Sequence, residues 1–179
     1  MGTLTGKRIA ILATDGVEEV ELTEPRRAVE AAGATADLVS LSATEIQSMT
    51  SDITPSATYP VDRVVADVDP AEYDALILPG GTVNADRLRM DADARSLVTA
   101  VLTAGKPVGV ICHGPWTLVE ADLVKGRTLT SFPSLRTDIR NAGGTVVDEE
   151  VVVDDNLVSS RNPDDLPAFC KAVVDTFAG

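Results

Sequence analysis

Short aliphatic runs alternate with amphipathic segments along the chain, and this alternation constrains the fold more than any other feature. Each run is too short for a helix and is rich in Ala, Val, Ile and Leu, which predicts a buried strand. Strands that alternate with helices require crossover connections, so the pattern predicts a mainly parallel sheet with helices on both faces. The four runs lie at residues 8–13, 36–41, 75–78 and 108–111, and the clearest helical segments lie at 18–32 and 91–104.

The remaining segments complete an α/β domain. Apolar periodicity predicts further helices at 115–121, 135–142 and 164–177 and a short strand at 129–130, and two Val-rich runs around Asp154-Asp155-Asn156 predict a β-hairpin. Residues 42–70 show weak periodicity, with 59–65 as the best strand candidate. A length of 179 residues without a visible linker suits one domain, 1–179.

Composition excludes several classes of partner. The chain has 15 Lys and Arg against 28 Asp and Glu, a net charge of −13, so nucleic acid and anionic membranes are poor partners. No apolar stretch approaches the ~20 residues of a membrane span, and the N-terminus lacks a signal-peptide pattern, so we expect a cytoplasmic protein. Two cysteines and one histidine are too few for a disulfide framework or a thiolate metal site, and we expect no metal.

Cys112 is the strongest candidate for chemistry. It follows the predicted strand 108–111, a helix is predicted to begin just after it, and Gly114 lies two residues on. This resembles half of a nucleophile elbow, although Val110 stands where the general motif has glycine. A helix N-terminus at this point is expected to lower the pKa of the thiol. The alternative is a cysteine buried as a small apolar residue.

The residues around Cys112 extend this hypothesis. His113, the only histidine, can act as general base or acid with the sulfur, or can be hydrogen-bonded elsewhere and contribute only its backbone N–H. Gly80 and Gly81 follow the strand 75–78, so they lie at the same sheet edge and can present N–H groups to an oxyanion, or can form an ordinary turn. We group Gly114 with them as a substrate-binding candidate.

Acidic and sulfur-containing residues elsewhere are weaker candidates. Glu18 follows the first strand and therefore points to the same edge, where it can donate to sulfur or transfer a proton. It also belongs to an acidic cluster whose members can simply be solvated. Cys170 lies in the last predicted helix, where no chemistry is expected of it.

Four strings occur in the same order as in a known family. The chain resembles the DJ-1/PfpI family, in the intracellular protease I (peptidase C56) branch of general stress proteins, over nearly its whole length. The strings are Glu18-Glu19-Val20-Glu21-Leu22, Leu78-Pro79-Gly80-Gly81, Val110-Ile111-Cys112-His113-Gly114-Pro115 and Ser159-Ser160-Arg161-Asn162-Pro163-Asp164-Asp165-Leu166.

The resemblance implies a flavodoxin-like three-layer sandwich similar to class I glutamine amidotransferases. It implies Cys112 as nucleophile, Glu18 as the acid beside the sulfur, His113 as a catalytic histidine, and an oxyanion hole from Gly81 and the His113 backbone. In this branch the third member is an acid of a neighbouring subunit, which aligns with Asp86 after a one-residue gap. The resemblance also implies no external cofactor and a homodimer or higher homo-oligomer, up to a hexamer.

Two classes of function follow from the resemblance. The first is an enzyme that acts through Cys112 on small reactive carbonyls, glycated proteins or peptides, as a glyoxalase III-like enzyme, deglycase or cysteine peptidase. The second is a redox-regulated chaperone or an oxidative-stress sensor, since a reactive thiolate is also readily oxidised. An amidotransferase-like glutaminase is disfavoured because no histidine follows position 113.

Overall fold

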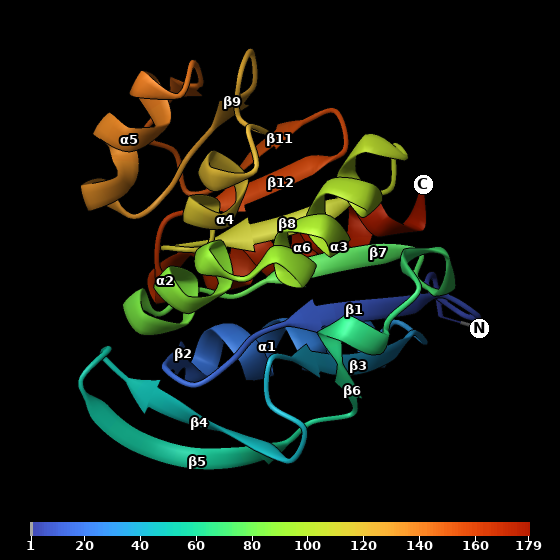
Figure 1. The fold of residues 1–179 in the computed structure, drawn as a ribbon. Helices are drawn as coiled ribbons and strands as arrows, with labels where there is room; N and C mark the ends of the chain where they lie inside the picture. Colours follow the sequence, from blue (N-terminus) through green and yellow to red (C-terminus); the bar gives the residue numbers. More distant parts are fainter. Residues whose placement is uncertain (1) are drawn as a thin grey trace.

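A seven-stranded, mainly parallel sheet forms the centre of the protein (Figure 1). The computed structural model describes residues 2–179. The strand order is β11-β12-β8-β7-β1-β3-β6, and only the edge pair β11–β12 is antiparallel. The α/β fold predicted from the alternating runs is therefore confirmed. The strands are β1 (Arg8–Leu12), β3 (Thr35–Ser40), β6 (Arg63–Val64), β7 (Ala75–Leu78), β8 (Val108–Ile111), β11 (Val152–Asp154) and β12 (Leu157–Ser160).

Helices cover both faces of the sheet, because the central strands are apolar on both sides. Within β1, Ala10 and Leu12 face one core while Ile9 and Ile11 face the other. The first core lies beneath α3 and α4, and the second lies beneath α1 and α6. The helices are α1 (Glu19–Ala31), α2 (Thr82–Met90), α3 (Ala92–Thr103), α4 (Pro115–Glu120), α5 (Arg136–Asn141) and α6 (Leu166–Ala178).

The region between β3 and β7 differs most from the sequence prediction. The strand expected at 59–65 is divided: β5 (Thr54–Pro60) ends at its proline and β6 follows separately. A short β2 (Val17–Glu18) pairs with β4 (Glu45–Thr50), which pairs with β5 to form a three-stranded sheet beside the main one. The β4–β5 hairpin brings its tip next to the start of α1 (Figure 1).

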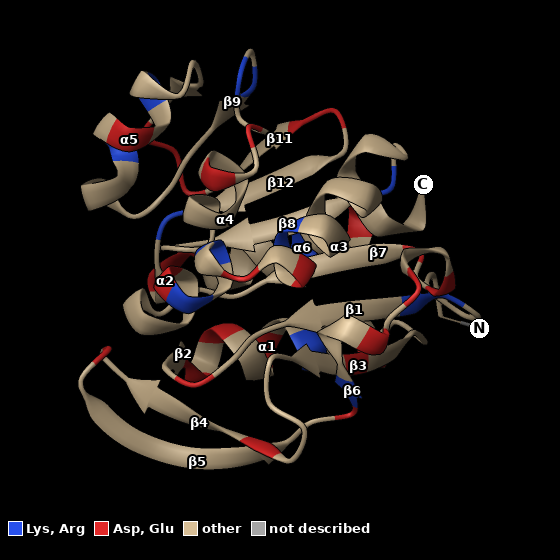
Figure 2. Cartoon of the chain, viewed as in Figure 1, with Lys and Arg blue, Asp and Glu red and all other residues tan. Residues whose placement is uncertain are grey.

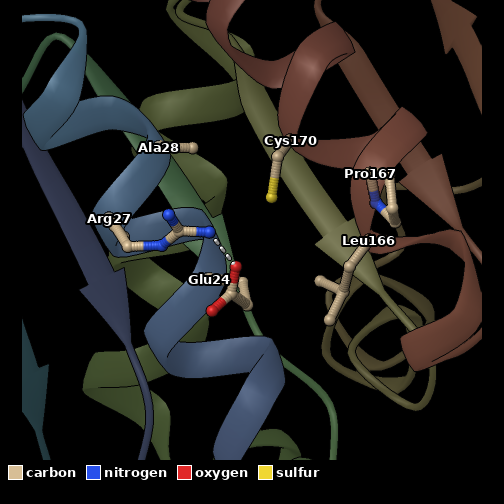
Figure 3. A pocket seen from close by; sticks show the side chains of 6 residues that line it. All are labelled: Glu24, Arg27, Ala28, Leu166, Pro167 and Cys170. Atoms are coloured by element: carbon tan, nitrogen blue, oxygen red, sulfur yellow. Dashed lines mark hydrogen bonds and ion pairs between the residues drawn. The ribbon is translucent and has the colours of Figure 1, made fainter.

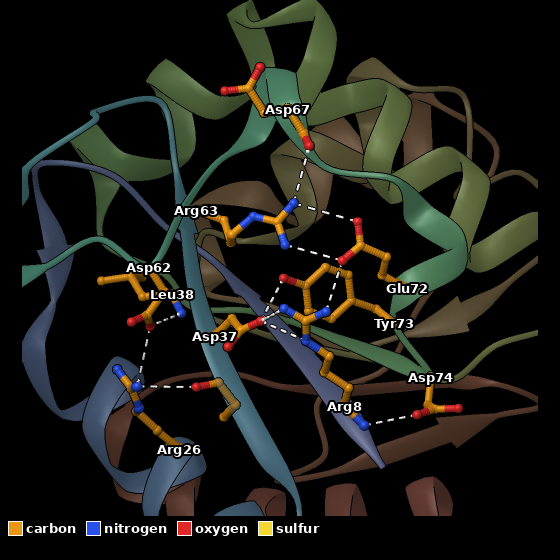
Figure 4. A network of polar contacts seen from close by, with 11 residues as sticks. Arg8, Arg26, Asp37, Leu38, Asp62, Arg63, Asp67, Glu72, Tyr73 and Asp74 are labelled. Carbon is orange, nitrogen blue, oxygen red and sulfur yellow. Dashed lines mark hydrogen bonds and ion pairs between the residues drawn. The ribbon is translucent and has the colours of Figure 1, made fainter. Parts of the chain in front are cut away.

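Ion pairs and hydrogen bonds join neighbouring elements at the amino end of β1. A cluster of ion pairs lies at the amino end of β1, where Arg8 binds Asp37 at 2.7 Å and Glu72 at 2.8 Å (Figure 4). The Tyr73 hydroxyl donates to Asp37 at 2.8 Å. These contacts join β1, β3 and the segment before β7 at the end of the sheet away from Cys112. None of the helices in residues 2–179 is long and apolar enough to cross a lipid bilayer.

Candidate active site

Cys112 occupies a sharp turn between β8 and α4. Its φ is +61°, in the left-handed region that non-glycine residues rarely adopt. The turn is closed by the Gly114 N–H, which donates to the Ile111 carbonyl at 2.9 Å, and the Cys112 N–H donates to the Ser160 carbonyl of β12 at 3.1 Å. The side chain is 5 % exposed and lines a cavity of about 200 Å³ at the carboxyl edge of the sheet.

The carboxyl group nearest the sulfur belongs to Glu21, which corrects the expectation for Glu18. Glu21 is fully buried in the first turn of α1, where the Gly80 N–H donates to its Oε2 at 2.7 Å. Its Oε1 has no hydrogen-bond partner within residues 2–179 and faces the same pocket as Cys112. The Glu18 carboxylate instead accepts the backbone N–H groups of Ser51 and Asp52 at 2.9 and 3.0 Å.

Burial sets the protonation of the Glu21–Cys112 pair. It raises the pKa of Glu21 to about 8, so this carboxyl is protonated at neutral pH. It also raises the pKa of the Cys112 thiol, and the negative charge of an ionised Glu21 adds to that shift. The predicted lowering by a helix N-terminus is wrong, because α4 has only six residues and desolvation dominates. A protonated thiol needs a base before it can attack.

His113 is placed to be that base. Its Nδ1 lies 3.1 Å from the Cys112 Sγ, and burial lowers the pKa of the imidazole, which is therefore neutral at pH 7. The ring stacks on Phe132, with centroids 4.5 Å apart, and contacts the edge of Trp116 at 5.4 Å. These contacts hold the imidazole against the sulfur.

The three candidate glycines have different roles. Hydrogen bonding from the backbone N–H groups of Gly81 and His113 lowers the pKa of Cys112. The Gly80 N–H is engaged by Glu21, and the Gly114 N–H is engaged in the turn. Neither Gly80 nor Gly114 therefore has a free donor for an oxyanion.

Asp86 is not brought to the sulfur within one chain. It lies on the exposed side of α2, and its side chain makes no hydrogen bond to any of residues 2–179. The acids that do face the cavity are Glu18, Glu21 and Asp52. Acidic residues accordingly follow one another at the start of α1 (Figure 2), and the tip of the β4–β5 hairpin carries Asp52.

Residues far along the chain complete the cavity rim. The guanidinium of Arg161 donates to both carboxylate oxygens of the buried Asp165 at 2.9 Å. The backbone N–H of Arg161 donates to the same carboxylate. This pair fixes the loop that carries Pro163 to the cavity, while Phe132 lines another wall. Residues 2–179 contain no cluster of three His, Cys, Asp or Glu side chains arranged to hold a metal ion.

Sequence reasoning missed Glu21, Asp52 and Asn84. A signal for Glu21 was present, because it lies four and eight residues before Pro25 and Val29 on the buried stripe of α1. Asn84 is buried in α2 and holds the Gly80 loop by donating to the Pro79 and Gly80 carbonyls, while it accepts the Thr14 N–H. Asp52 had no such signal, since a loop carries it.

Comparison with known proteins identifies the family. The profile described as the DJ-1/PfpI family matches residues 7–176. The chain belongs to the DJ-1/PfpI family. It is 42 % identical to Protein/nucleic acid deglycase 2 of Escherichia coli over 91 % of this chain and 93 % of that protein. It is 41 % identical to "Putative cysteine protease YraA" of Bacillus subtilis, covering 91 % and 94 % of the two chains.

A further relative and a solved structure are also similar to this chain. General stress protein 18 of Bacillus subtilis is 41 % identical, over 92 % of this chain and 94 % of that protein. The crystal structure of Drosophila melanogaster DJ-1beta superposes with a TM-score of 0.87 at 24 % identity, covering 100 % of this chain and 92 % of that one. The flavodoxin-like, class I glutamine amidotransferase-like architecture is thus confirmed.

Proposed function

We propose that this DJ-1/PfpI protein is a stress-response enzyme that acts on small reactive carbonyls or glycated adducts, with Cys112 as its nucleophile. The observation that carries the proposal is the imidazole Nδ1 of His113, 3.1 Å from a thiol on a strained turn. A relative named as a deglycase shares 42 % of its sequence, which supports this substrate class.

The site residues divide the work of addition to an aldehyde such as methylglyoxal. His113 Nδ1 takes the thiol proton as sulfur bonds to the aldehyde carbon, and the carbonyl oxygen becomes an oxyanion facing the Gly81 and His113 N–H groups. Protonation of this oxygen gives a hemithioacetal, for which neutral Glu21 is a proton donor at the site. The C1 hydrogen then moves to C2 while the C1 hydroxyl proton passes to the C2 oxygen, an isomerisation that gives a lactoyl thioester without any oxidant. Water hydrolyses this thioester to lactate, and the leaving thiolate regains the proton that His113 took.

Cavity size and charge favour a small neutral carbonyl over a peptide. The cavity of about 200 Å³ is smaller than the ~300–1,000 Å³ typical of drug-sized ligands. Glu18 and Asp52 on its wall oppose anionic substrates, whereas a neutral dicarbonyl or a glycated Lys or Arg side chain meets no like charge. Cysteine peptidase activity remains the second candidate, supported by the name of the YraA relative.

Methylglyoxal consumption by purified protein tests the proposal. Wild type and Cys170→Ala should both consume it, while Cys112→Ala should lose at least ~100-fold in rate, because the covalent route is absent. Retention of the rate by Cys112→Ala would remove Cys112 as the nucleophile. If wild type is inactive yet peroxide oxidises Cys112 before Cys170 in a mass-spectrometric assay, the sensor hypothesis replaces the enzyme.

Assembly is part of the same proposal. We expect a homodimer or higher oligomer, as the family resemblance implies, and a role for Asp86 requires that a second subunit place it near a cavity. Light scattering gives the mass in solution, and Asp86→Asn then tests whether that carboxylate affects turnover.

A further inference from the structure

The second nitrogen of His113 contacts two hydroxyl groups. Its Nε2 lies 3.3 Å from the Thr82 Oγ1 at the start of α2 and 3.4 Å from the Ser134 Oγ. A neutral imidazole carries one proton, so this nitrogen and Nδ1 cannot both be donors. The role of His113 as a base depends on which nitrogen holds the proton.

The Thr82 hydroxyl is already committed as a donor. It donates to the Asp52 Oδ2 at 3.1 Å, and an ionised carboxylate can only accept. Because a hydroxyl has one proton, Thr82 Oγ1 can then only accept from His113 Nε2–H. In this arrangement Nε2 carries the imidazole proton, with the Thr82 and Ser134 oxygens as acceptors, and the Nδ1 lone pair faces the Cys112 thiol at 3.1 Å.

Asp52 is itself held in place by the fold. Ser51 and Asp52 both have left-handed φ angles, +54° and +65°, at the tip of the β4–β5 hairpin. The Glu18 carboxylate accepts both of their N–H groups, which fixes this strained turn. The Asp52 Oδ1 then accepts the Thr82 N–H at 2.7 Å, so Asp52 contacts Thr82 through both carboxylate oxygens.

We propose that Asp52 and Thr82 are positioning residues of the active site, which fix the His113 tautomer so that Nδ1 accepts the Cys112 proton, with Glu18 holding Asp52 in place. This inference rests on the proposed function of Cys112 and His113. In this arrangement the acid is Asp52 of the same chain, whereas the family resemblance implies an acid of a neighbouring subunit that aligns with Asp86. The arrangement follows the logic of a Ser-His-Asp triad, with a threonine hydroxyl inserted between acid and imidazole.

The single histidine makes the tautomer directly measurable. Nitrogen NMR of protein labelled with ¹⁵N-histidine gives signals from His113 alone, because the chain has one histidine. Wild type at pH 7.5 should show the proton on Nε2. In Asp52→Asn the new amide can donate to Thr82 Oγ1, which frees the threonine proton for Nε2, so the tautomer should shift toward Nδ1–H.

Thiol alkylation gives the functional readout without any turnover. In a Cys170→Ala background, Asp52→Asn and Thr82→Val should slow iodoacetamide alkylation of Cys112 at least ~10-fold at pH 7.5, because the base is lost or misdirected. Ser134→Ala should retain the Nε2–H tautomer. Matched controls are Asp91→Asn, whose carboxylate accepts the Ala94 N–H in α3, and Thr99→Val in the same helix.

The outcomes separate this inference from the proposed function. A wild-type Nδ1–H tautomer, or an unchanged tautomer and alkylation rate in a folded Asp52→Asn variant, overturns the role of Asp52 even if methylglyoxal is consumed. The expected tautomer shift in a wild type that consumes no carbonyl supports the positioning role and overturns the substrate instead. Backbone amide spectra of each variant show that it is folded.

Discussion

Cys112 and Cys170 each line a small cavity, but their surroundings differ. The Cys170 cavity measures about 220 Å³ and lies between α1 and α6 (Figure 3). Burial, with a smaller contribution from the charge of Glu24, raises the pKa of Cys170 to about 11, although Arg27 acts to lower it. Each thiol thus lines a cavity of its own that also contains a carboxyl group.

The difference lies in the groups that can move a proton. Cys170 has a helical backbone, and the Glu24 carboxylate beside it is ion-paired with Arg27, which cannot accept a proton at any ordinary pH. Cys112 lies on a strained turn with a neutral imidazole at 3.1 Å and two backbone N–H groups at its sulfur. A cavity with a cysteine and a carboxylate is therefore not enough to propose a reactive site; a positioned base and donors are also needed.

The largest effect is expected from adding one methyl group beside Cys112. In Gly80→Ala the new Cβ would lie 2.4 Å from the Glu21 Oε2 and 2.6 Å from the Cys112 Cβ, so the site must shift. A displacement of this size should reduce carbonyl turnover ~100-fold. Gly105→Ala serves as the control: its Cβ would meet no atom within 4 Å, and although the φ of +77° strains alanine there, this strain lies outside the site and should change turnover little. Equal rates for the two variants would contradict this geometry.

The buried acid beside Cys112 should make stability depend on pH in an unusual direction. Glu21 has its pKa raised to about 8, so between pH ~4.5 and 8 the folded state binds more protons than the unfolded state. The free energy of unfolding should therefore fall as pH rises through this window, by up to ~1.4 kcal/mol per pH unit from this group. Below ~4.5 both states are protonated and the dependence ends.

Glu21→Gln isolates that contribution. The amide keeps an oxygen that can accept the Gly80 N–H and cannot ionise. Urea unfolding at pH 6.5 and pH 8 should show a smaller loss of stability in the variant than in wild type, and the comparison cancels the titration of His113. Parallel slopes for the two proteins would mean that Glu21 is ionised throughout.

The smallest effect is expected at the second cysteine. Glu24→Gln removes the carboxylate that raises the pKa of Cys170, so alkylation of Cys170 should become faster. We expect no more than about threefold, because partly exposed charges interact weakly in water. The rate is measured in a Cys112→Ala background. A gain of 100-fold would show that Cys170 needs only a change of charge to become reactive, and would undermine the contrast with Cys112.

The central sheet could be predicted because its strands are almost wholly apolar. β7 and β8 lie at the predicted residues, since each is buried on both faces and bounded by Gly or Pro. Helix α2 was not predicted, because its buried face includes the polar Asn84 and offers little apolar periodicity. The buried Asn84 that hides α2 from prediction also holds the loop of Gly80, because it donates to the Pro79 and Gly80 carbonyls.

The sequence predicts where a candidate residue lies when the backbone alone determines its position, and it does not predict the direction of a side chain. The elbow at Cys112 follows from a buried strand that runs into a glycine turn. In α1 hydropathy alone favours burial of Val20 over Glu21, whereas Val20 is 39 % exposed and Glu21 faces inward. Asp52 lies at a hairpin tip whose two residues, Ser51 and Asp52, have left-handed φ angles. No local sequence pattern predicts this tip conformation.

Because the backbone of Cys112 is left-handed, the residue type at position 112 indicates whether a DJ-1/PfpI chain depends on a thiol there. Glycine adopts this conformation freely, while any other residue there costs the fold about 1 kcal/mol or more. A chain that does not need a thiol at this edge would become more stable if glycine replaced the cysteine. Among related chains, cysteine at the position of Cys112 should thus accompany thiol chemistry. Glycine at that position should accompany a more stable fold without thiol chemistry.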